Sequence, residues 1–138
     1  MTYGVLIDAG PIVAILNRRE QDHAVCVGTL KKIGRPLLST WMPVTEAMYL
    51  LDSSVVAQNA LLEMIERGFL KILEIGASDL PPIRALINKY NDQPMDFADA
   101  TLVHVANREG LQEIFTLDRR DFNIYKLKQN RPFKVVPT

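Results

Sequence analysis

Short apolar runs alternate with longer helical runs along the chain, and this alternation limits the folds that the chain can adopt. Five short runs have the composition of buried strands, at residues 3–7, 36–40, 70–75, 113–117 and 133–136. Six longer runs carry helix signals such as an opening Pro or Asp and a closing Gly, at residues 11–17, 22–33, 43–51, 55–67, 79–90 and 96–108. Strands that alternate with helices of about 10–15 residues form βαβ units. We therefore expect an α/β fold, a three-layer α/β/α sandwich around a central, mostly parallel five-stranded sheet.

The length and the charge balance are those of an ordinary globular protein. We expect one domain over residues 1–138, long enough to bury roughly two thirds of the surface of its unfolded chain. Sixteen acidic and sixteen basic residues cancel, so a nucleic acid has to be recognised by a local arrangement of charges. The sequence opens without the pattern of a secretion signal, and its apolar runs are shorter than the ~20 residues of a membrane-spanning helix. We expect a cytoplasmic protein with no membrane partner.

Cysteine and histidine are too few to favour a zinc centre. The single Cys26 cannot form an internal disulfide, and we interpret it as a small buried hydrophobic side chain. The two histidines, His23 and His104, are expected on the surface or partly packed. His104 lies five residues after Asp99, about 140° round a helix from it, so it should point elsewhere.

Acidic residues occur where ligands bind to parallel sheets, which is outside the carboxyl ends of the strands. Asp8 ends the first strand, and Asp118 ends the strand EIFTL. Glu46 is expected in the first turn of the helix after the second strand. Asp96 and Asp99 open the helix that precedes EIFTL. In a parallel sheet these side chains can converge at one edge.

Each acid also has a purely structural interpretation. Asp8 can accept hydrogen bonds from the free amides of the next helix, and the helix dipole favours Glu46 in a first turn. Asp96 and Asp99 have the spacing of an N-cap and its N3 residue, and Asp118 can cap the turn that follows it. Taken jointly, three or four carboxylates at one site repel each other strongly unless a cation offsets their charge.

Carboxylate oxygens are the ligands of hard divalent cations such as Mg²⁺ or Mn²⁺. A pair of such cations activates a water for in-line attack on phosphorus and neutralises charge on the leaving oxygen. The chain has no glycine-rich phosphate loop of the P-loop type, so the use of nucleoside triphosphates is not supported. The residues alone therefore predict metal-dependent hydrolysis of a phosphodiester or a phosphomonoester.

The four best-placed acids stand in segments that resemble a known family. Asp8 in LIDAGPIVAIL, Glu46 in PVTEAMYLL, Asp99 in MDFADATLVHVA and Asp118 in FTLDRRDF resemble the PIN-domain ribonucleases in order and spacing. The resemblance is greatest to the VapC-like toxins of type II toxin–antitoxin systems, and it covers essentially the whole chain. It implies a PIN-like fold, an acidic pocket that binds Mg²⁺ or Mn²⁺, and endonuclease activity on single-stranded RNA.

The resemblance also implies a role for each acid. Asp8 and Asp99 match the positions most consistently assigned as metal ligands. Glu46 matches the third acid and Asp118 the fourth, which acts directly or through water. All four are expected to be catalytic, and Asp96 matches an extra acid of this subgroup that would contribute to metal binding.

Other side chains near these acids have two interpretations each. Thr116 matches a position that often carries a hydroxyl beside the metal site, but it is equally explained as a β-branched strand residue. Arg18, Arg19, Arg119 and Arg120 are candidate contacts to RNA phosphates. The last two are explained as well, or better, by surface ion pairs with Asp118 and the neighbouring acid.

Apolar side chains around the helix at residues 43–51 exceed what one helix face can bury. They are Trp41, Met42, Met48, Tyr49, Leu50 and Leu51. PIN-type toxins commonly form homodimers and hold a hydrophobic antitoxin segment near such helices, so the resemblance implies a homodimer and a cognate antitoxin besides the RNA substrate. The alternative is that these residues belong to the core.

Two other hypotheses compete with the ribonuclease: a module without turnover, and a different acidic-pocket α/β protein such as a phosphatase or a receiver domain. A PIN-like module that binds RNA or assembles without turnover would share the fold, although it would normally have lost one of the acids. An acidic-pocket phosphatase needs a second acid two residues after Asp8, where Gly10 stands. A receiver domain needs a phosphate-accepting Asp at the end of a central strand, where Thr40 stands.

Overall fold

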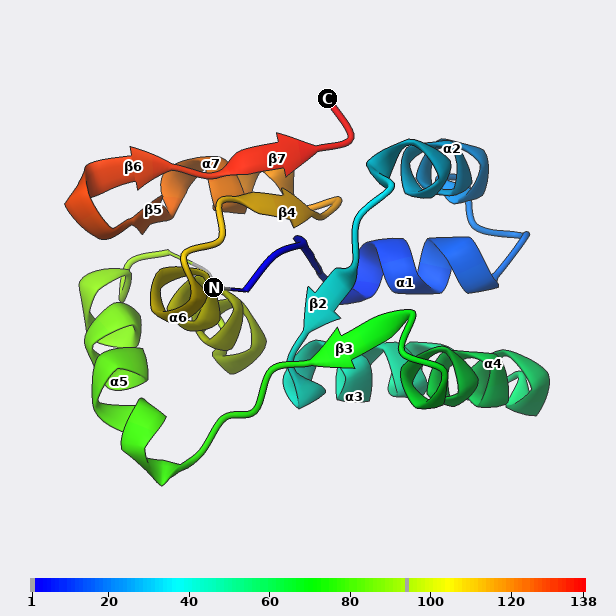
Figure 1. Cartoon of the computed structure of the whole chain (residues 1–138), viewed down its shortest axis with the longest axis horizontal. Coiled ribbons are helices and arrows are strands. Elements are labelled where there is room, and N and C mark those ends of the chain that lie inside the picture. Colours follow the sequence, from blue (N-terminus) through cyan, green and yellow to red (C-terminus); the bar gives the residue numbers. More distant parts are fainter. Residues whose placement is uncertain (1, 94) are drawn as a thin grey trace.

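The computed structural model describes residues 2–93 and 95–138. Its main sheet has five strands in the order β3-β2-β1-β4-β7, and all neighbouring pairs are parallel (Figure 1). The strands are β1 (Val5–Ile7), β2 (Leu37–Ser39), β3 (Leu70–Ile72), β4 (Glu113–Phe115) and β7 (Lys134–Val136). The predicted five-stranded sheet is therefore confirmed, and each strand begins or ends within one of the five apolar runs.

Helices cover both faces of the sheet. Within the described residues they are α1 (Ala9–Leu16), α2 (His23–Ile33), α3 (Trp41–Leu50), α4 (Val55–Glu66), α5 (Leu80–Lys89), α6 (Phe97–Glu109) and α7 (Arg119–Ile124). Figure 1 shows α5 and α6 on one side of the sheet and α1, α2 and α4 on the other. This arrangement is the predicted three-layer sandwich.

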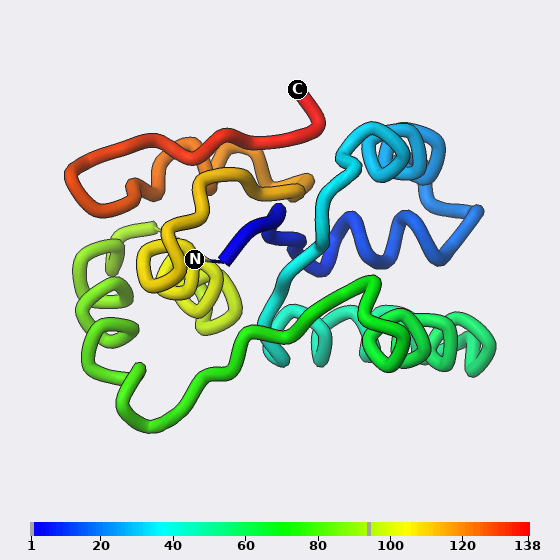
Figure 2. Tube along the Cα trace, viewed as in Figure 1, coloured from blue at the N-terminus to red at the C-terminus, as the bar shows by residue number. Residues whose placement is uncertain are grey.

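The alternation of side chains along the strands explains the two layers. Val5 and Ile7 point into a core cluster shared with α1, α3 and α4, whereas Leu6 between them points into a second cluster shared with α6 and α7. All three side chains are at most 1% exposed. The central strand β1 thus contributes to both cores, and the tube in Figure 2 shows it passing through the middle of the fold.

The C-terminal part differs from the expectation. The short helix α7 and an antiparallel pair, β5 (Lys126–Leu127) with β6 (Arg131–Pro132), were not predicted. These elements are too short to give a clear periodicity in the sequence. They are held instead by aromatic packing, in which Phe122 contacts Tyr125 and Phe133 edge to face, with ring centroids 5.2 and 5.6 Å apart.

The start of α3 also corrects the sequence analysis. The helix begins at Trp41, two residues before Pro43, because Thr40 is its N-cap. Glu46 therefore lies in the second turn rather than the first, and no acidic residue occupies the first turn. The helix dipole does not explain why an acid stands at this position.

The end of α6 that lies far from its first turn is fixed by an ion-pair cluster. His104 Nε2 lies 2.7 Å and Arg108 Nη1 3.1 Å from Asp79 Oδ1, and Gly76 N donates to Asp79 Oδ2 at 2.8 Å. The hydrogen bonds from Gly76 and His104 hold the pKa of Asp79 well below its usual range. His104 is more buried than expected, at 8% exposed.

One further expectation is met by the described residues. Cys26 is fully buried in the core, and burial raises the pKa of its thiol to about 11. Across residues 2–93 and 95–138, we find no helix with the length and hydrophobicity that crossing a bilayer requires.

Gly4 provides a test of the contact between β1 and β2. Its φ is +150°, and a Cβ atom there would lie 2.5 Å from the Pro36 carbonyl oxygen, which accepts the hydrogen bond that aligns Val5. Gly4→Ala should therefore lower the free energy of unfolding in urea by about 1–3 kcal/mol. The matched control is Gly28→Ala in α2, where a Cβ meets nothing within 4 Å. It should raise that free energy by roughly 0.4–1 kcal/mol, and equal effects of the two changes would contradict the close contact.

Candidate active site

Asp8 is held at the carboxyl end of the central strand by two local contacts. It follows β1 directly, and its backbone N–H donates to the Phe115 carbonyl at 3.0 Å, which extends the pairing of β1 with β4. Its side chain is the N-cap of α1 and accepts from Ala9 N at 2.8 Å. The structural interpretation of Asp8 is thus correct, and the same contacts fix a carboxylate that is only 5% exposed.

Asp99 reaches the same edge from α6. This helix leads into β4 and runs against it, so that its first turn lies at the carboxyl ends of the strands. Asp96 is the N-cap and accepts from Asp99 N at 2.8 Å, as the spacing predicted. Asp96 remains exposed, whereas Asp99 turns inward and is 7% exposed.

Two hydroxyl groups bind the buried carboxylates. Thr116 Oγ1 donates to Asp8 Oδ2 at 3.0 Å and accepts from Asp118 N at the same distance. Tyr125 Oη donates to Asp99 Oδ2 at 3.1 Å. Burial and the nearby Asp99 raise the pKa of Tyr125, so that its phenol keeps the proton that it donates. Thr116 is therefore a neighbour of the site rather than only a strand residue.

A layer of small hydroxyl side chains lies beneath this edge. Ser39 Oγ donates to the Ile7 carbonyl at 2.9 Å, which links the ends of β1 and β2. Thr101 Oγ1 donates to the Ala98 carbonyl at 2.7 Å. Thr40 Oγ1 lies 2.8 Å from Thr101 Oγ1. Because the Thr101 proton is engaged, Thr40 must be the donor of the second bond. This layer ties β2 to α6.

The other predicted acids form the exposed rim. Glu46 in α3 and Asp96 line a shallow groove between α3 and the start of α6. Asp118 is the N-cap residue of α7, but its side chain makes no capping hydrogen bond. Capping therefore does not explain Asp118.

Burial and the charges of neighbouring acids raise the pKa of the two buried acids. The pKa of Asp8 rises to about 6, chiefly because of burial, with smaller contributions from the charges of Asp118 and Glu46. The pKa of Asp99 rises to about 8 through burial and then the charges of Asp96, Asp8 and Asp118. Hydrogen bonds to each carboxylate offset only part of this effect.

The rim acids repel each other as well. Burial, then Asp96 and Asp118, raise the pKa of Glu46, and burial, then Asp121 and Asp96, raise that of Asp118. In the described parts of the chain, the ion pairs of Lys, Arg and His all involve other acids. The site is therefore a concentration of negative charge that the described side chains do not neutralise.

The donor set fits a hard divalent cation in its chemistry, because all the candidate ligands are carboxylates. The second layer of hydrogen bonds also fits, since Thr116 and Tyr125 orient the buried carboxylates as outer partners orient metal ligands. In this structure, however, the acids do not surround a common point. Among residues 2–93 and 95–138, no three His, Cys, Asp or Glu side chains are placed to hold one metal ion. Binding would require the exposed acids to turn toward Asp8 and Asp99.

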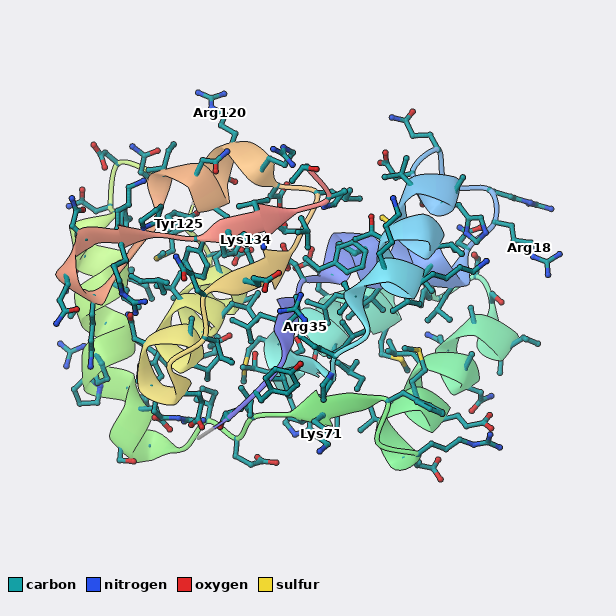
Figure 3. The ribbon with its side chains drawn as sticks, turned by 45° about the horizontal axis from the view of Figure 1, so that its top comes forward. Arg18, Arg35, Lys71, Arg120, Tyr125 and Lys134 are labelled. Carbon is teal, nitrogen blue, oxygen red and sulfur yellow. The ribbon has the colours of Figure 1, made fainter. Side chains whose placement is uncertain are left out.

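The candidate arginines do not gather around these acids. Arg18 and Arg19 follow the far end of α1, roughly 12 Å along the helix from Asp8. The Arg119 guanidinium donates to the Pro137 carbonyl, and the predicted ion pairs of Arg119 and Arg120 with neighbouring acids do not occur among the described residues. Figure 3 shows Arg18 and Arg120 extending outward from different sides of the molecule.

Sequence reasoning missed Tyr125, Thr40 and Thr101 as parts of the site. Thr40 could have been noticed, because it follows the second strand at the same edge as Asp8. Tyr125 gave no signal, since it follows a helix that was not predicted. The position of its hydroxyl depends on how α7 packs against α6.

Known proteins resemble this chain along most of its length. Residues 5–127 match the PIN domain family. Ribonuclease VapC26 of Mycobacterium tuberculosis (strain ATCC 25618 / H37Rv) is 29% identical over 135 residues, which cover 96% of this chain and 100% of the relative.

Two solved structures have the same fold. The crystal structure of VapC20 of Mycobacterium tuberculosis, a sarcin-ricin loop cleaving toxin, superposes with a TM-score of 0.73 at 14% identity and covers 80% of this chain and 86% of that one. VapBC2 of Rickettsia felis, bound to a DNA fragment from its promoter, gives 0.65 at 13% identity and covers 95% and 97%. The resemblance inferred from the four acids is thus confirmed: the chain belongs to the PIN-domain family and is VapC-like.

Proposed function

We propose that this protein is a Mg²⁺- or Mn²⁺-dependent endoribonuclease that cleaves single-stranded RNA, with Asp8, Glu46, Asp99 and Asp118 as catalytic metal ligands and Asp96 as an additional one. One observation carries the proposal. Asp8 and Asp99 are two buried carboxylates with raised pKa, and no cationic side chain among the described residues pairs with them. The relative named ribonuclease VapC26 supports the choice of RNA as substrate.

The residues have distinct tasks in this proposal. A cation held by these acids would supply an activated water and would neutralise charge on the leaving oxygen. Asp8 and Asp99 give fixed oxygens, because their partners Thr116 and Tyr125 hold them in place. Glu46 and Asp118 are exposed and can move to complete the ligand set, and Asp96 keeps its second oxygen available beside its capping bond. The alternative, an RNA-binding or assembly module without turnover, is less favoured because it would not need the repulsion that these acids create.

We further propose that the protein is the toxin of a cytoplasmic toxin–antitoxin pair and forms a homodimer. The structure of VapBC2 from Rickettsia felis supports the existence of a cognate antitoxin. The apolar residues around α3 divide between the two interpretations. Leu51 is buried in the core, but Tyr49 and Leu50 are 74% and 50% exposed. They continue into the exposed Val55 and Val56 of α4, and this surface is available to a partner chain.

The raised pKa values predict how stability depends on pH. An unfolded Asp has a pKa of about 4, so the native state binds more protons than the unfolded state up to about pH 8. The free energy of unfolding in chelator should therefore fall as the pH rises from about 4 to 8. Asp99→Asn should reduce this slope, because it removes the charge. Urea titrations at several pH values measure the effect.

Added Mn²⁺ should reverse this trend, because the ion competes with protons for the same carboxylates. The increase in melting temperature should be larger at about pH 8 than at about pH 5, and much smaller in Asp8→Asn and Asp99→Asn. An unchanged melting temperature at every pH would contradict the metal site.

Removing either buried carboxylate should abolish cleavage. Asp8→Asn and Asp99→Asn are expected to lower the rate on a set of defined single-stranded RNAs by roughly 100-fold or more, as is a chelator. Asp52→Asn is the matched control, since Asp52 is an exposed acid outside the site. RNA binding by the parent without turnover in Mn²⁺ would favour the binding module. Cleavage that survives both substitutions and the chelator would exclude the proposed chemistry.

Thr116 should matter through its hydroxyl group. Thr116→Val keeps the shape but removes the donor to Asp8 and the acceptor for Asp118 N, so cleavage should fall roughly 10- to 100-fold. Thr116→Ser keeps both hydrogen bonds and should restore most of the rate. The comparison uses initial rates at saturating Mn²⁺, and equal rates for Val and Ser would show that the hydroxyl has no role.

A further inference from the structure

A shallow groove lies beside the acidic site, and the proposed chemistry uses only the two acids in its wall. It lies between α3 and the start of α6, and its volume is ≈ 390 Å³, within the roughly 300–1,000 Å³ of ligand pockets. It is lined by Met42, Thr45, Glu46, Asp96, Phe97 and Ala98. Two of the proposed metal ligands thus form part of its wall, so a molecule that reaches the acids also passes this groove.

The apolar part of the groove is unusual for its position. Phe97 is the first residue of α6, directly after Asp96, and it is 44% exposed. Met42 on α3 is half-buried. Its ring is nearly half exposed beside the carboxylates of Glu46 and Asp96, and it offers a flat surface for stacking.

The polar part of the groove consists of hydrogen-bond acceptors. An ionised carboxylate has about four lone-pair sites, so Glu46 and Asp96 can each bind a metal ion and still accept a hydrogen bond from a ligand of the groove. The Thr45 hydroxyl donates its proton to the Trp41 carbonyl at 2.8 Å, which leaves the lone pairs of its oxygen for a ligand. A ligand of this groove therefore has to bring N–H donors, and a phosphate would be repelled by the two carboxylates.

We propose that this groove binds one unpaired nucleobase of the RNA strand, stacked on Phe97, next to the phosphodiester that is cleaved. This inference rests on the proposed ribonuclease function. A nucleobase is neutral and flat, and aromatic side chains stack on the splayed bases of single strands. The acceptors favour a base with an exocyclic amino group, which adenine, cytosine and guanine have and uracil lacks. A base held here cannot be paired, which selects single strands over duplexes.

The test combines a protein change with a nucleic-acid change. The probe is a short fluorescein-labelled single-stranded RNA of all four bases, with the cut position mapped for the parent protein. A set of variants of this RNA keeps the whole backbone, and each variant has an abasic site at one position near the cut. Phe97→Ala should lower kcat/KM on the intact RNA roughly 10-fold, the effect of losing one stacking contact. On the one version that lacks the stacked base, kcat/KM of the parent should fall by the same factor of roughly 10 relative to the intact RNA. For Phe97→Ala, removing that base should cause no further fall in kcat/KM.

Matched variants separate stacking from a general effect. Phe97→Trp should keep the rate, and Phe97→Leu should behave like Ala. Phe69→Ala is the control, because Phe69 is also exposed but precedes β3, away from the acids. The increase in melting temperature on adding Mn²⁺ should be the same for Phe97→Ala and the parent, which a damaged metal site would not allow.

Three outcomes would overturn the inference. Phe97→Ala could cleave every RNA as fast as the parent does. Its kcat/KM could also lie below that of the parent by the same factor on every version of the RNA, including the version that lacks the stacked base. It could also change the mass in sedimentation equilibrium together with the rate, which would make Phe97 a contact to another protein chain. If the parent protein itself cleaves no RNA in Mn²⁺, the proposed function fails, and that result is distinct from the other three.

Discussion

Repulsion between two buried carboxylates is the constraint on which the rest of the site depends. Asp8 and Asp99 are brought to one edge of the sheet by β1 and α6, which are separated by most of the chain. Both side chains are poorly hydrated, and the charge of Asp8 adds to the burial that raises the pKa of Asp99. A fold that keeps such a pair loses stability at neutral pH, and this cost is the reason why we propose a positively charged ligand for it.

The structural and functional interpretations of the acids are not alternatives here. The N-cap bond from Ala9 to Asp8 stabilises the start of α1, and it also prevents the carboxylate from rotating away. The bond from Thr116 acts in the same way on the other oxygen of Asp8. Capping therefore accounts for the position of Asp8, while the concentration of acids around it accounts for its chemistry.

Most of the fold and the principal acids could be predicted from the sequence, because both depend on local patterns. The five apolar runs specify strands, and the parallel arrangement places Asp8 and Asp118 at one edge. The N-cap role of Asp96 followed from its spacing to Asp99. The turn occupied by Glu46 was predicted wrongly, since Pro43 was taken as the start of α3.

Other parts of the site depend on packing between distant segments, which leaves no local pattern. Tyr125 reaches Asp99 of α6 through the packing of α7, in which Phe122 makes edge-to-face contacts with Tyr125 and Phe133. The distance of Arg18 from the acids follows from the direction of α1, so closeness in the sequence to Asp8 was misleading. Arg119 likewise binds the Pro137 carbonyl, which lies 18 residues later in the sequence, so no local pattern indicated this contact.

Attraction between charged groups acts at one end of α6, and repulsion between carboxylates acts at the other. Its last turns are fixed by attraction, through His104 and Arg108 to Asp79, whereas its first turn carries like charges that repel. At the first turn the repulsion acts on a side chain that is itself held, because Asp96 caps Asp99 N and Tyr125 donates to Asp99 Oδ2. Asp99 therefore cannot relieve the repulsion by rotating away, and the side chains that can respond are the exposed Glu46 and Asp118. An ion or a strand that arrives at this end meets a fixed buried carboxylate beneath more mobile exposed ones.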